Sequence, residues 1–385
     1  MLGLDICKIS KVEIIYNKYQ DQFLKRIFTD DEIHYLRKKN FRGKTIAGLF
    51  AAKEAMAKAE GNGIGVNSFH DIKIFHTERG KPYGRLQGKT YEISISHDGD
   101  YAIALAFLSN DLIDDSNFSH WKKLLQRESR INKYSAGTIF VRSSKRGMLG
   151  AGALVSMAAL RTGAGMVYLI LPQDTIDFMS VKVTEPVLLS REKSFQEGLT
   201  KSQVIIIGPG TGTDEREEEF LYKILNEKKK FVIDADAITI LSGKKSYENI
   251  PRGAIVTPHE GEFSRLMGKK YENRQEMERD CKIFAKEYGL TMVLKGPMTY
   301  VTDGNREYYN ERGNSLLATA GSGDVLSGIL GALYCRSEDP FIVAMGGVRL
   351  HSLLAESYFM KYGQGMVAGD LLKELPTTIK KLVYY

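Results

Sequence analysis

Apolar and polar residues follow two different patterns along the chain, and the change falls near residue 115. The first part contains short stretches in which apolar and polar positions alternate, and it contains two amphipathic segments. The predicted strands are 71–75, 91–96 and 101–108. The predicted helices are 30–39, where Thr29 precedes an acidic first turn, and the alanine-rich segment 46–59. This pattern indicates a small α+β domain.

From residue 133 onward, apolar runs of strand length alternate with helical segments. The predicted strands are 138–141, 166–171, 204–207, 231–233, 254–256 and 292–294, and the predicted helices include 151–161 and 215–225. Nearly continuous apolar strands separated by helices are typical of a mainly parallel sheet with helices on both faces, an α/β fold. The intervening residues, about 109–132, are polar and predict a linker with one short helix. The predicted organisation is a domain at 1–112, a linker at 113–130 and a domain at 131–385.

Composition narrows the class of protein without naming an activity. The 385 residues are 43% hydrophobic and 26% charged, which is ordinary for a globular protein of two or three domains. No apolar run approaches the roughly 18 residues that a membrane helix needs. Three scattered cysteines indicate free thiols, so we expect a cytoplasmic protein without a membrane anchor. The net charge of +7 is compatible with an acidic partner, and no basic–aromatic pattern predicts nucleic-acid binding.

Candidate chemistry in the first domain centres on two carboxylates and a lysine. Asp5 lies within a short apolar run, where an unpaired carboxylate would be costly. Glu54 lies in the predicted helix, and Lys58 follows one turn later on the same face. One or two carboxylates with substrate oxygens suit Mg²⁺. The alternative from these residues alone is structural: a turn aspartate and an exposed helix ion pair.

The order of these motifs resembles the holo-acyl-carrier-protein synthase family over residues 1–108. The matching motifs are Gly3-Leu-Asp-Ile6, Ala51-Ala-Lys-Glu-Ala55 with Lys58, Gly80-Lys-Pro82 and Ser94-Ile-Ser-His97. The resemblance implies that Asp5 and Glu54 hold Mg²⁺ against coenzyme A, which Lys58, Lys81, Ser96 and His97 also bind. It implies 4′-phosphopantetheine transfer to a serine of acyl carrier protein, and a homo-oligomer. Two positions depart from the family: Lys11 replaces an arginine, and Leu49 replaces another.

The strongest motif of the second domain is Ala318-Thr-Ala-Gly-Ser-Gly-Asp-Val-Leu-Ser-Gly328, a glycine-rich turn that leads into an apolar helix. Small residues at a helix N-terminus expose backbone N–H groups that bind anions. A carboxylate there, Asp324, can accept a proton from a hydroxyl that attacks a phosphate held by the turn. A plain helix cap is the alternative.

Three further motifs follow predicted strands: Gly208-Pro-Gly-Thr-Gly212, Thr257-Pro-His-Glu-Gly-Glu-Phe263 and Lys295-Gly-Pro-Met-Thr299. The carboxyl ends of parallel strands form the usual ligand edge of such a sheet. Together with Gly150-Ala-Gly-Ala-Leu154, these motifs resemble the ADP- or ATP-dependent NAD(P)H-hydrate dehydratases over about 130–382. The resemblance implies a ribokinase-like fold with Mg²⁺ at the nucleotide phosphates. It implies that Lys295, Gly296, Pro297, Met298, Thr299 and Gly323 bind ADP or ATP, and that Ala151, Gly210, Gly212, His259 and the catalytic Asp324 face the NAD(P)H hydrate.

One departure and several alternatives remain. Arg142 stands in Phe140-Val-Arg-Ser-Ser-Lys-Arg-Gly147, where the family has a small-residue loop, so we expect bulk and charge beside the substrate. The second domain could instead be a ribokinase-like small-molecule kinase, because both groups share the Gly-Ser-Gly-Asp element. The first domain could be a non-catalytic scaffold that binds coenzyme A or oligomerises. A sensor that only binds nucleotide is a further alternative.

Overall fold

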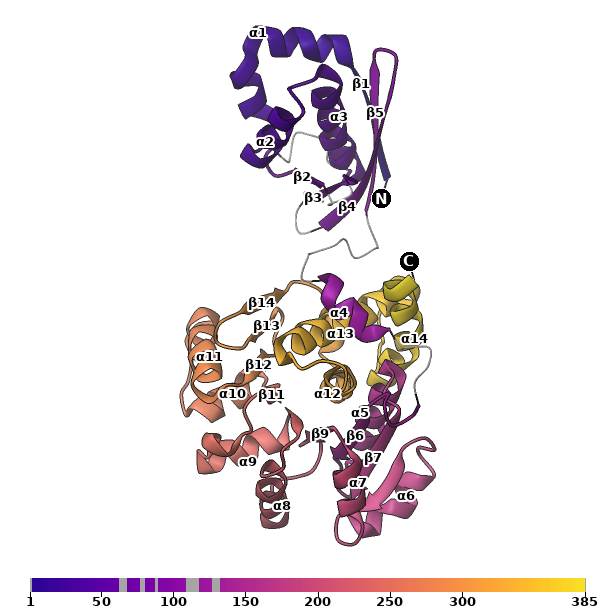
Figure 1. The fold of residues 1–385 in the computed structure, drawn as a ribbon, viewed down its shortest axis with the longest axis vertical. Coiled ribbons are helices and arrows are strands. Elements are labelled where there is room, and N and C mark those ends of the chain that lie inside the picture. The colour runs from indigo at the N-terminus through magenta and orange to yellow at the C-terminus, as the bar shows by residue number, and fades with distance from the viewer. Residues whose placement is uncertain are drawn as a thin grey trace. The chain divides into compact units, whose positions relative to one another are not determined.

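The computed structural model describes residues 2–61, 68–76, 80–86, 89–108, 118–126 and 132–384 (Figure 1). The chain forms two compact units, Met1–Asp115 and Ser116–Tyr385. Within the described ranges, no helix combines the length and the apolar character that crossing a bilayer requires. Much of the predicted linker lies outside the described residues.

The first unit is an antiparallel sheet packed on helices. Its elements are β1 (Leu2–Lys8), α1 (Ile9–Ile27), α2 (Asp30–Lys38), α3 (Gly43–Ala59), β2 (Lys73–His76), β3 (Pro82–Leu86), β4 (Lys89–Asp98) and β5 (Tyr101–Leu108). The strand order is β1-β5-β4-β3-β2, and α3 lies across one face (Figure 1). A Cβ on Gly3 would lie 2.0 Å from the carbonyl oxygen of Ala55, so glycine allows β1 and α3 to approach closely.

Strand β4 has an open edge in this sheet. Strand β3 pairs with β4 only as far as Tyr83 and Glu92, and the other neighbour, β5, occupies the opposite side. Among the described strands, none pairs with residues 93–97 on the β3 side. This edge faces α2 and α3, and it borders a cavity described below.

A buried ion pair connects the helices of this unit. Lys53 of α3 is fully buried, and its Nζ lies 2.7 Å from Oε2 of Glu32, which is 2% exposed. The ammonium also donates to the carbonyl oxygens of Phe69 and Ile72, both at 2.8 Å. Glu32 closes a capping box with Thr29 at the start of α2 and accepts from the Ile74 amide. Four separate segments therefore meet at one buried charge pair.

The second unit is a nine-stranded sheet between two helical layers (Figure 1). Its strands are β6 (Thr138–Arg142), β7 (Met166–Leu171), β8 (Val187–Ser190), β9 (Val204–Ile207), β10 (Lys230–Ile233), β11 (Ile255–Val256), β12 (Thr291–Leu294), β13 (Thr299–Thr302) and β14 (Glu307–Asn310). The order is β14-β13-β12-β11-β10-β9-β6-β7-β8. The strands from β12 to β8 are parallel, and β13 and β14 form an antiparallel hairpin. The predicted mainly parallel sheet is confirmed.

Helices cover both faces of this sheet. One layer contains α7 (Phe195–Lys201), α8 (Glu215–Leu225), α9 (Asp236–Lys244), α10 (Glu260–Met267) and α11 (Arg274–Tyr288). The other contains α4 (Phe118–Leu125), α5 (Leu149–Thr162), α12 (Ser322–Tyr334), α13 (Pro340–Tyr362) and α14 (Ala368–Tyr384), and α6 (Ile176–Ser180) follows β7. Strand β9 shows why its run is wholly apolar: Ile205 and Ile207 join the first layer's core, and Ile206 meets Gly331 of α12.

Helix α4 is the short helix expected within residues 109–132. It packs on α13 and α14, so its contacts place it in the second unit. Trp121, the single tryptophan, is buried against Gly346 of α13.

Candidate functional site

In the first unit, one cluster joins β1 to the second half of α3. Lys58 Nζ lies 2.7 Å from Oδ1 of Asp5 and donates to the Leu4 carbonyl at 3.2 Å. Glu54 lies close enough to interact with both: burial raises the pKa of Glu54, the charge of Asp5 raises it further, and Lys58 opposes the shift. The structure thus brings together the three residues that the sequence singled out for metal and phosphate. Two partly buried carboxylates beside one lysine are a donor set that suits Mg²⁺.

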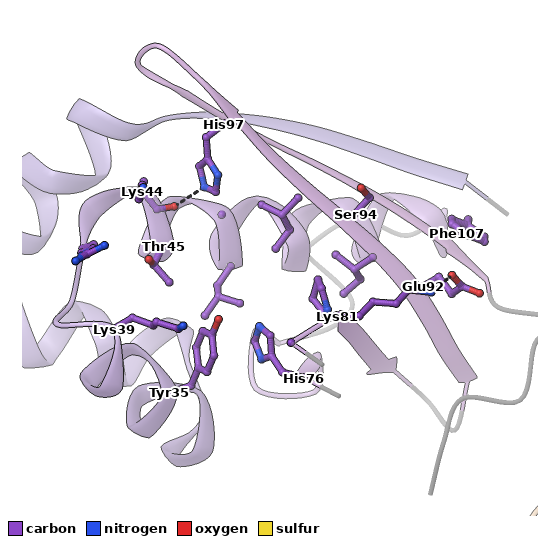
Figure 2. Close-up of a pocket in the computed structure, with 17 residues that line it drawn as sticks. Tyr35, Lys39, Lys44, Thr45, His76, Lys81, Glu92, Ser94, His97 and Phe107 are labelled. Atoms are coloured by element: carbon purple, nitrogen blue, oxygen red, sulfur yellow. Dashed lines mark hydrogen bonds and ion pairs between the residues drawn. The ribbon is translucent and has the colours of Figure 1, made fainter. Parts of the chain in front are cut away.

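A second feature of this unit is a cavity of about 570 Å³ between α2, α3 and the open edge of β4 (Figure 2). Four basic side chains and two imidazole rings line it: Lys39, Arg42, Lys44 and Lys81, with His76 and His97. The rings of Tyr35 and His76 stack with centroids 3.9 Å apart, and Lys39 Nζ lies 5.8 Å from the Tyr35 ring. Burial lowers the pKa of His76, and the charge of Lys39 lowers it further. The cavity is therefore suited to an anion with a flat group.

The residues predicted to bind coenzyme A are divided between the Asp5–Lys58 cluster and this cavity. Lys81 lines the cavity and pairs with Glu92 at 2.7 Å, and His97 Nε2 lies 2.8 Å from the Lys44 carbonyl oxygen (Figure 2). Ser96 does not line the cavity, although its β4 neighbours Ser94 and His97 do. Leu49, which replaces an expected arginine, does line it. Positive charge there comes instead from Lys39 and Arg42, which precede α3, and from Lys44 in its first turn.

In the second unit, the predicted loops meet at the carboxyl ends of the parallel strands. His259 and Lys295 form a β-bridge beyond β11 and β12. A Cβ on Gly210 would lie 3.0 Å from the Ala151 Cβ, and one on Gly323 would lie 3.6 Å from Lys295 Nζ. Five residues from separate motifs thus lie at the edge that the carboxyl ends of the parallel strands form.

A buried charge network lies under this edge. Lys295 Nζ lies 2.8 Å from Oδ1 of Asp234, and Ser327 of α12 donates to Oδ2 of the same carboxylate at 2.8 Å. Burial tends to raise the pKa of Asp234, but the charge and hydrogen bond of Lys295 outweigh it and lower that pKa overall. Asp234 is therefore an ionised partner that holds Lys295 in place.

Asp324 lies in the first turn of α12, after Gly321, which adopts a φ of +87°. Burial raises the pKa of Asp324 to about 7, and the nearby negative charge of Asp234 contributes to that rise. Lys295 opposes the shift, and Asp236 adds to it. A carboxylate with such a pKa is suited to exchange protons at neutral pH.

A cavity of about 760 Å³ adjoins this network. His259, Lys295, Gly296, Pro297, Thr299 and Gly323 line it, whereas Met298 is 43% exposed and does not. Asp324, Ala151, Gly210 and Gly212 do not line this cavity. The residues predicted for the nucleotide and those predicted for the hydrate thus lie mostly in two adjoining places.

His259 has a structural role in addition to lining the cavity. Its Nδ1 accepts from the amides of Gly261 and Glu262, at 3.0 and 3.2 Å, and so caps α10. Because Nδ1 is an acceptor, the ring proton of neutral His259 resides on Nε2, which lies 3.5 Å from Oε1 of Glu262.

Sequence reasoning missed several residues of this region. Arg274 of α11 donates to the carbonyl oxygens of Leu294 and Met298, both at 3.1 Å, and so braces the turn that contains Lys295. Buried His351 and the polar residues Asn310 and Asn314 line the cavity. The polar run Asn310-Glu-Arg-Gly-Asn-Ser315, just before the glycine-rich motif, was an available signal for two of them.

Arg142 differs from expectation. Its side chain is fully buried beneath the loop that follows β6, and it pairs there with Glu217. It therefore adds no bulk to the substrate side, because its guanidinium turns into the protein.

Comparison with known proteins agrees with the division of the chain into two units. A family model described as NAD(P)H-hydrate dehydratase matches residues 144–377, and one described as the 4′-phosphopantetheinyl transferase superfamily matches residues 1–106. The ADP-dependent (S)-NAD(P)H-hydrate dehydratase of Neisseria meningitidis is 36% identical over 268 residues, which are 67% of this chain and 88% of that protein.

Two further relatives extend the comparison. The bifunctional NAD(P)H-hydrate repair enzyme Nnr of Escherichia coli is 30% identical over 320 residues, 81% of this chain but only 61% of that enzyme. The chain spans 52% of the corresponding enzyme of Moorella thermoacetica. The structure of the Bacillus subtilis ADP/ATP-dependent NAD(P)H-hydrate dehydratase, crystallised with ATP and Mg²⁺, matches with a TM-score of 0.61 and 26% identity, over 69% of this chain and 97% of that one.

The second unit therefore has a ribokinase-like fold. The chain belongs to the NAD(P)H-hydrate dehydratase family, and its first 106 residues form a domain of the 4′-phosphopantetheinyl transferase superfamily.

Proposed function

We propose that the second unit dehydrates (S)-NAD(P)H hydrate to NAD(P)H at the expense of ADP or ATP. The observation that supports this most is Asp324, a carboxylate with a pKa of about 7 at a helix N-terminus, beside Lys295 and the 760 Å³ cavity. The relatives in Neisseria meningitidis and Bacillus subtilis bear this activity in their names.

The proposed reaction begins with proton removal. Asp324 takes the proton of the hydrate's hydroxyl, whose oxygen then forms a bond to the terminal phosphorus of the nucleotide as the bond to the leaving phosphate breaks. Backbone N–H groups at the start of α12 and the ammonium of Lys295 stabilise the transferring phosphate. Inorganic phosphate then leaves this ester with the electrons of the C–O bond, and loss of a proton from the adjacent carbon restores the dihydronicotinamide. Bound Mg²⁺ would neutralise nucleotide phosphate charge.

The assay for this proposal uses the full chain with (S)-NADH hydrate and either ADP or ATP. We expect the absorbance of reduced nicotinamide to appear in step with release of inorganic phosphate. A ribokinase-like small-molecule kinase would leave the hydrate unchanged or produce a stable phosphate ester, and a nucleotide sensor would bind without turnover. Either result would refute the dehydratase.

The pH dependence of this activity follows from Asp324. Only the ionised carboxylate accepts a proton, so kcat/KM should rise with pH up to the pKa of about 7 and then level off. The control is the affinity for nucleotide over the same range, which should change less because Asp234 stays ionised beside Lys295. A profile that is flat across neutral pH would contradict the assignment of Asp324 as the base.

We propose that the first unit transfers 4′-phosphopantetheine from coenzyme A to a serine of acyl carrier protein. Asp5 and Glu54 would hold Mg²⁺, which supplies charge neutralisation for the phosphates. Lys58, which pairs with Asp5, is placed to contact a phosphate when it leaves that carboxylate. The cavity with Lys81 and His97 supports the binding of a nucleotide end, and its cations provide charge that Leu49 lacks.

A homo-oligomer is part of this proposal. The outer face of the sheet, opposite α3, exposes Leu2, Leu4 and Ile6 of β1 at 66%, 57% and 59%, and Phe107 of β5 lies beside Leu2. An apolar face of this kind is typical of a protein–protein interface. The mass of the full chain in solution tests it, and a monomer would refute it.

The Glu54→Gln substitution tests the transferase. Loss of a charged metal ligand should lower the rate by at least about 100-fold, because a metal ion contributes several kcal/mol of charge stabilisation. The measurement is the mass gain of apo acyl carrier protein incubated with the full chain, coenzyme A and Mg²⁺. Asp31→Asn, an exposed carboxylate in the first turn of α2, is the matched control and should leave the rate unchanged. No mass gain with the unaltered chain would favour a non-catalytic scaffold.

A further inference from the structure

The loop after β6 is held from beneath by a buried arginine. The guanidinium of Arg142 pairs with both carboxylate oxygens of Glu217, at 3.0 and 2.5 Å. It also donates to the carbonyl oxygens of Ser143, Ser144 and Ile170, at 3.1, 3.0 and 3.0 Å. Both side chains are buried, at 0% and 4% exposure. Such a pair is costly to break but fixes the groups around it in one arrangement.

The same loop contains a backbone conformation that needs support. Ser144 has a φ of +75°, which is unfavourable for a residue other than glycine. Its Oγ accepts from the Gly152 amide at 2.8 Å, and its own amide donates to the Pro209 carbonyl at 3.0 Å. The hydroxyl of Ser143 donates to that carbonyl as well, at 2.5 Å. The loop is thus tied both to the first turn of α5 and to the glycine-rich loop after β9.

This arrangement places Lys145 over the glycine-rich loop. A Cβ on Gly212 would lie 2.8 Å from Lys145 Nζ, so the ammonium lies against the backbone of Gly212, which has a φ of +83°. The Gly212 amide donates to Oδ2 of Asp236 at 2.8 Å. Within the described ranges, the ammonium of Lys145 forms no ion pair or hydrogen bond, and the residue is exposed. A cation without a partner beside a proposed substrate loop is available to bind an anion.

We propose that Lys145 binds a phosphate of the dinucleotide substrate, and that Arg142 and Glu217 are positioning residues that hold Lys145 over Gly212. This inference rests on the proposed dehydratase function, in which Gly210 and Gly212 face the hydrate. The hydrate carries a pyrophosphate next to the nucleotide that contains its reacting nicotinamide ring. The other phosphate-bearing ligand, ADP or ATP, has its own cavity, which Lys145 does not line.

The test compares three variants of the full chain. Lys145→Met should raise the KM for NADH hydrate about 10- to 100-fold, the effect of losing one charge-assisted contact. Its kcat and its KM for nucleotide should stay near those of the unaltered chain. Lys145→Arg should restore most of the affinity, and Arg146→Met, which removes another exposed cation of the same loop, should have no effect. An unchanged KM in Lys145→Met would overturn the proposal.

A double variant tests the positioning part. Arg142→Met should raise the same KM, and adding Lys145→Met should raise it little further, because both changes remove one contact. Fully additive effects would overturn the positioning role. If Arg142→Met does not fold, Glu217→Gln takes its place in the comparison of single and double variants. The Lys145 variants by themselves test whether Lys145 contacts the phosphate. Failure of the dehydratase proposal is distinct, since the unaltered chain would then show no turnover of the hydrate.

Discussion

Replacing Asp324 by Asn should lower dehydratase turnover about 10²- to 10⁴-fold, the usual contribution of a positioned general base. The amide keeps the shape of the carboxyl group but cannot accept the hydroxyl proton. Nucleotide binding should persist, because Lys295, Gly296, Pro297 and Thr299 line the cavity independently of that carboxylate. The measurements are single-turnover formation of reduced nicotinamide and calorimetric binding of ADP.

The same substitution should stabilise the second unit at neutral and alkaline pH. The folded pKa of Asp324, about 7, lies above its usual value, so the folded state binds more protons than the unfolded state between those two pH values. The free energy of unfolding therefore falls as pH rises through this range, and the full loss is reached above about pH 7. Removing the Asp324 charge should raise the free energy of unfolding by on the order of 1–2 kcal/mol, after allowance for the partial exposure of the group. Asp177→Asn, which removes an exposed carboxylate in the first turn of α6, is the control for stability.

For the turnover prediction, an unchanged rate in Asp324→Asn would exclude Asp324 as the base.

Replacing Lys53 by Met should destabilise the first unit by about 3–5 kcal/mol, the usual cost of breaking a buried ion pair from one side. The change leaves Glu32 charged in the protein interior and leaves the carbonyl oxygens of Phe69 and Ile72 without their donor. Because α2, α3 and the segment before β2 meet at this ammonium, the loss should affect the whole unit.

Hydrogen exchange of the full chain measures this effect, with peptides from the second unit as the internal reference. Protection in residues 2–61 should fall, and protection in residues 132–384 should not. Lys25→Met, an exposed lysine of α1, is the matched control. The double variant Glu32→Gln/Lys53→Met should recover part of the loss, since no unpaired charge remains. Equal protection in Lys53→Met and in the unaltered chain would contradict the prediction.

Sequence pattern predicted most of the second unit because its strands are short, buried on both faces and regularly separated. Strands β7 and β9 and helix α8 have the bounds that the apolar runs predicted. Helix α1 was not predicted, because only Val12, Leu24 and Ile27 are buried along its 19 residues and Gln20 breaks it with a φ of +39°. With so few buried positions, no helical period stands out.

For the sites, motifs predicted which residues would be near a ligand but not how they are held. The cluster of Asp5 and Lys58 and the edge with Ala151, Gly210 and Lys295 follow from motif order and strand direction. The support of these residues depends on partners far away in the sequence, such as Arg142 with Glu217. No local pattern links such positions, and only the fold brings them together.

The open edge of β4 has a consequence for solubility. Unpaired backbone groups at a sheet edge can recruit a strand from another chain and so start aggregation. Here Lys39, Arg42 and Lys44 lie around that edge in the cavity lining. A strand that added to residues 93–97 would have to bury these cations without partners, which is unfavourable. The charges proposed to attract coenzyme A thus also protect the chain from aggregation while the cavity is empty.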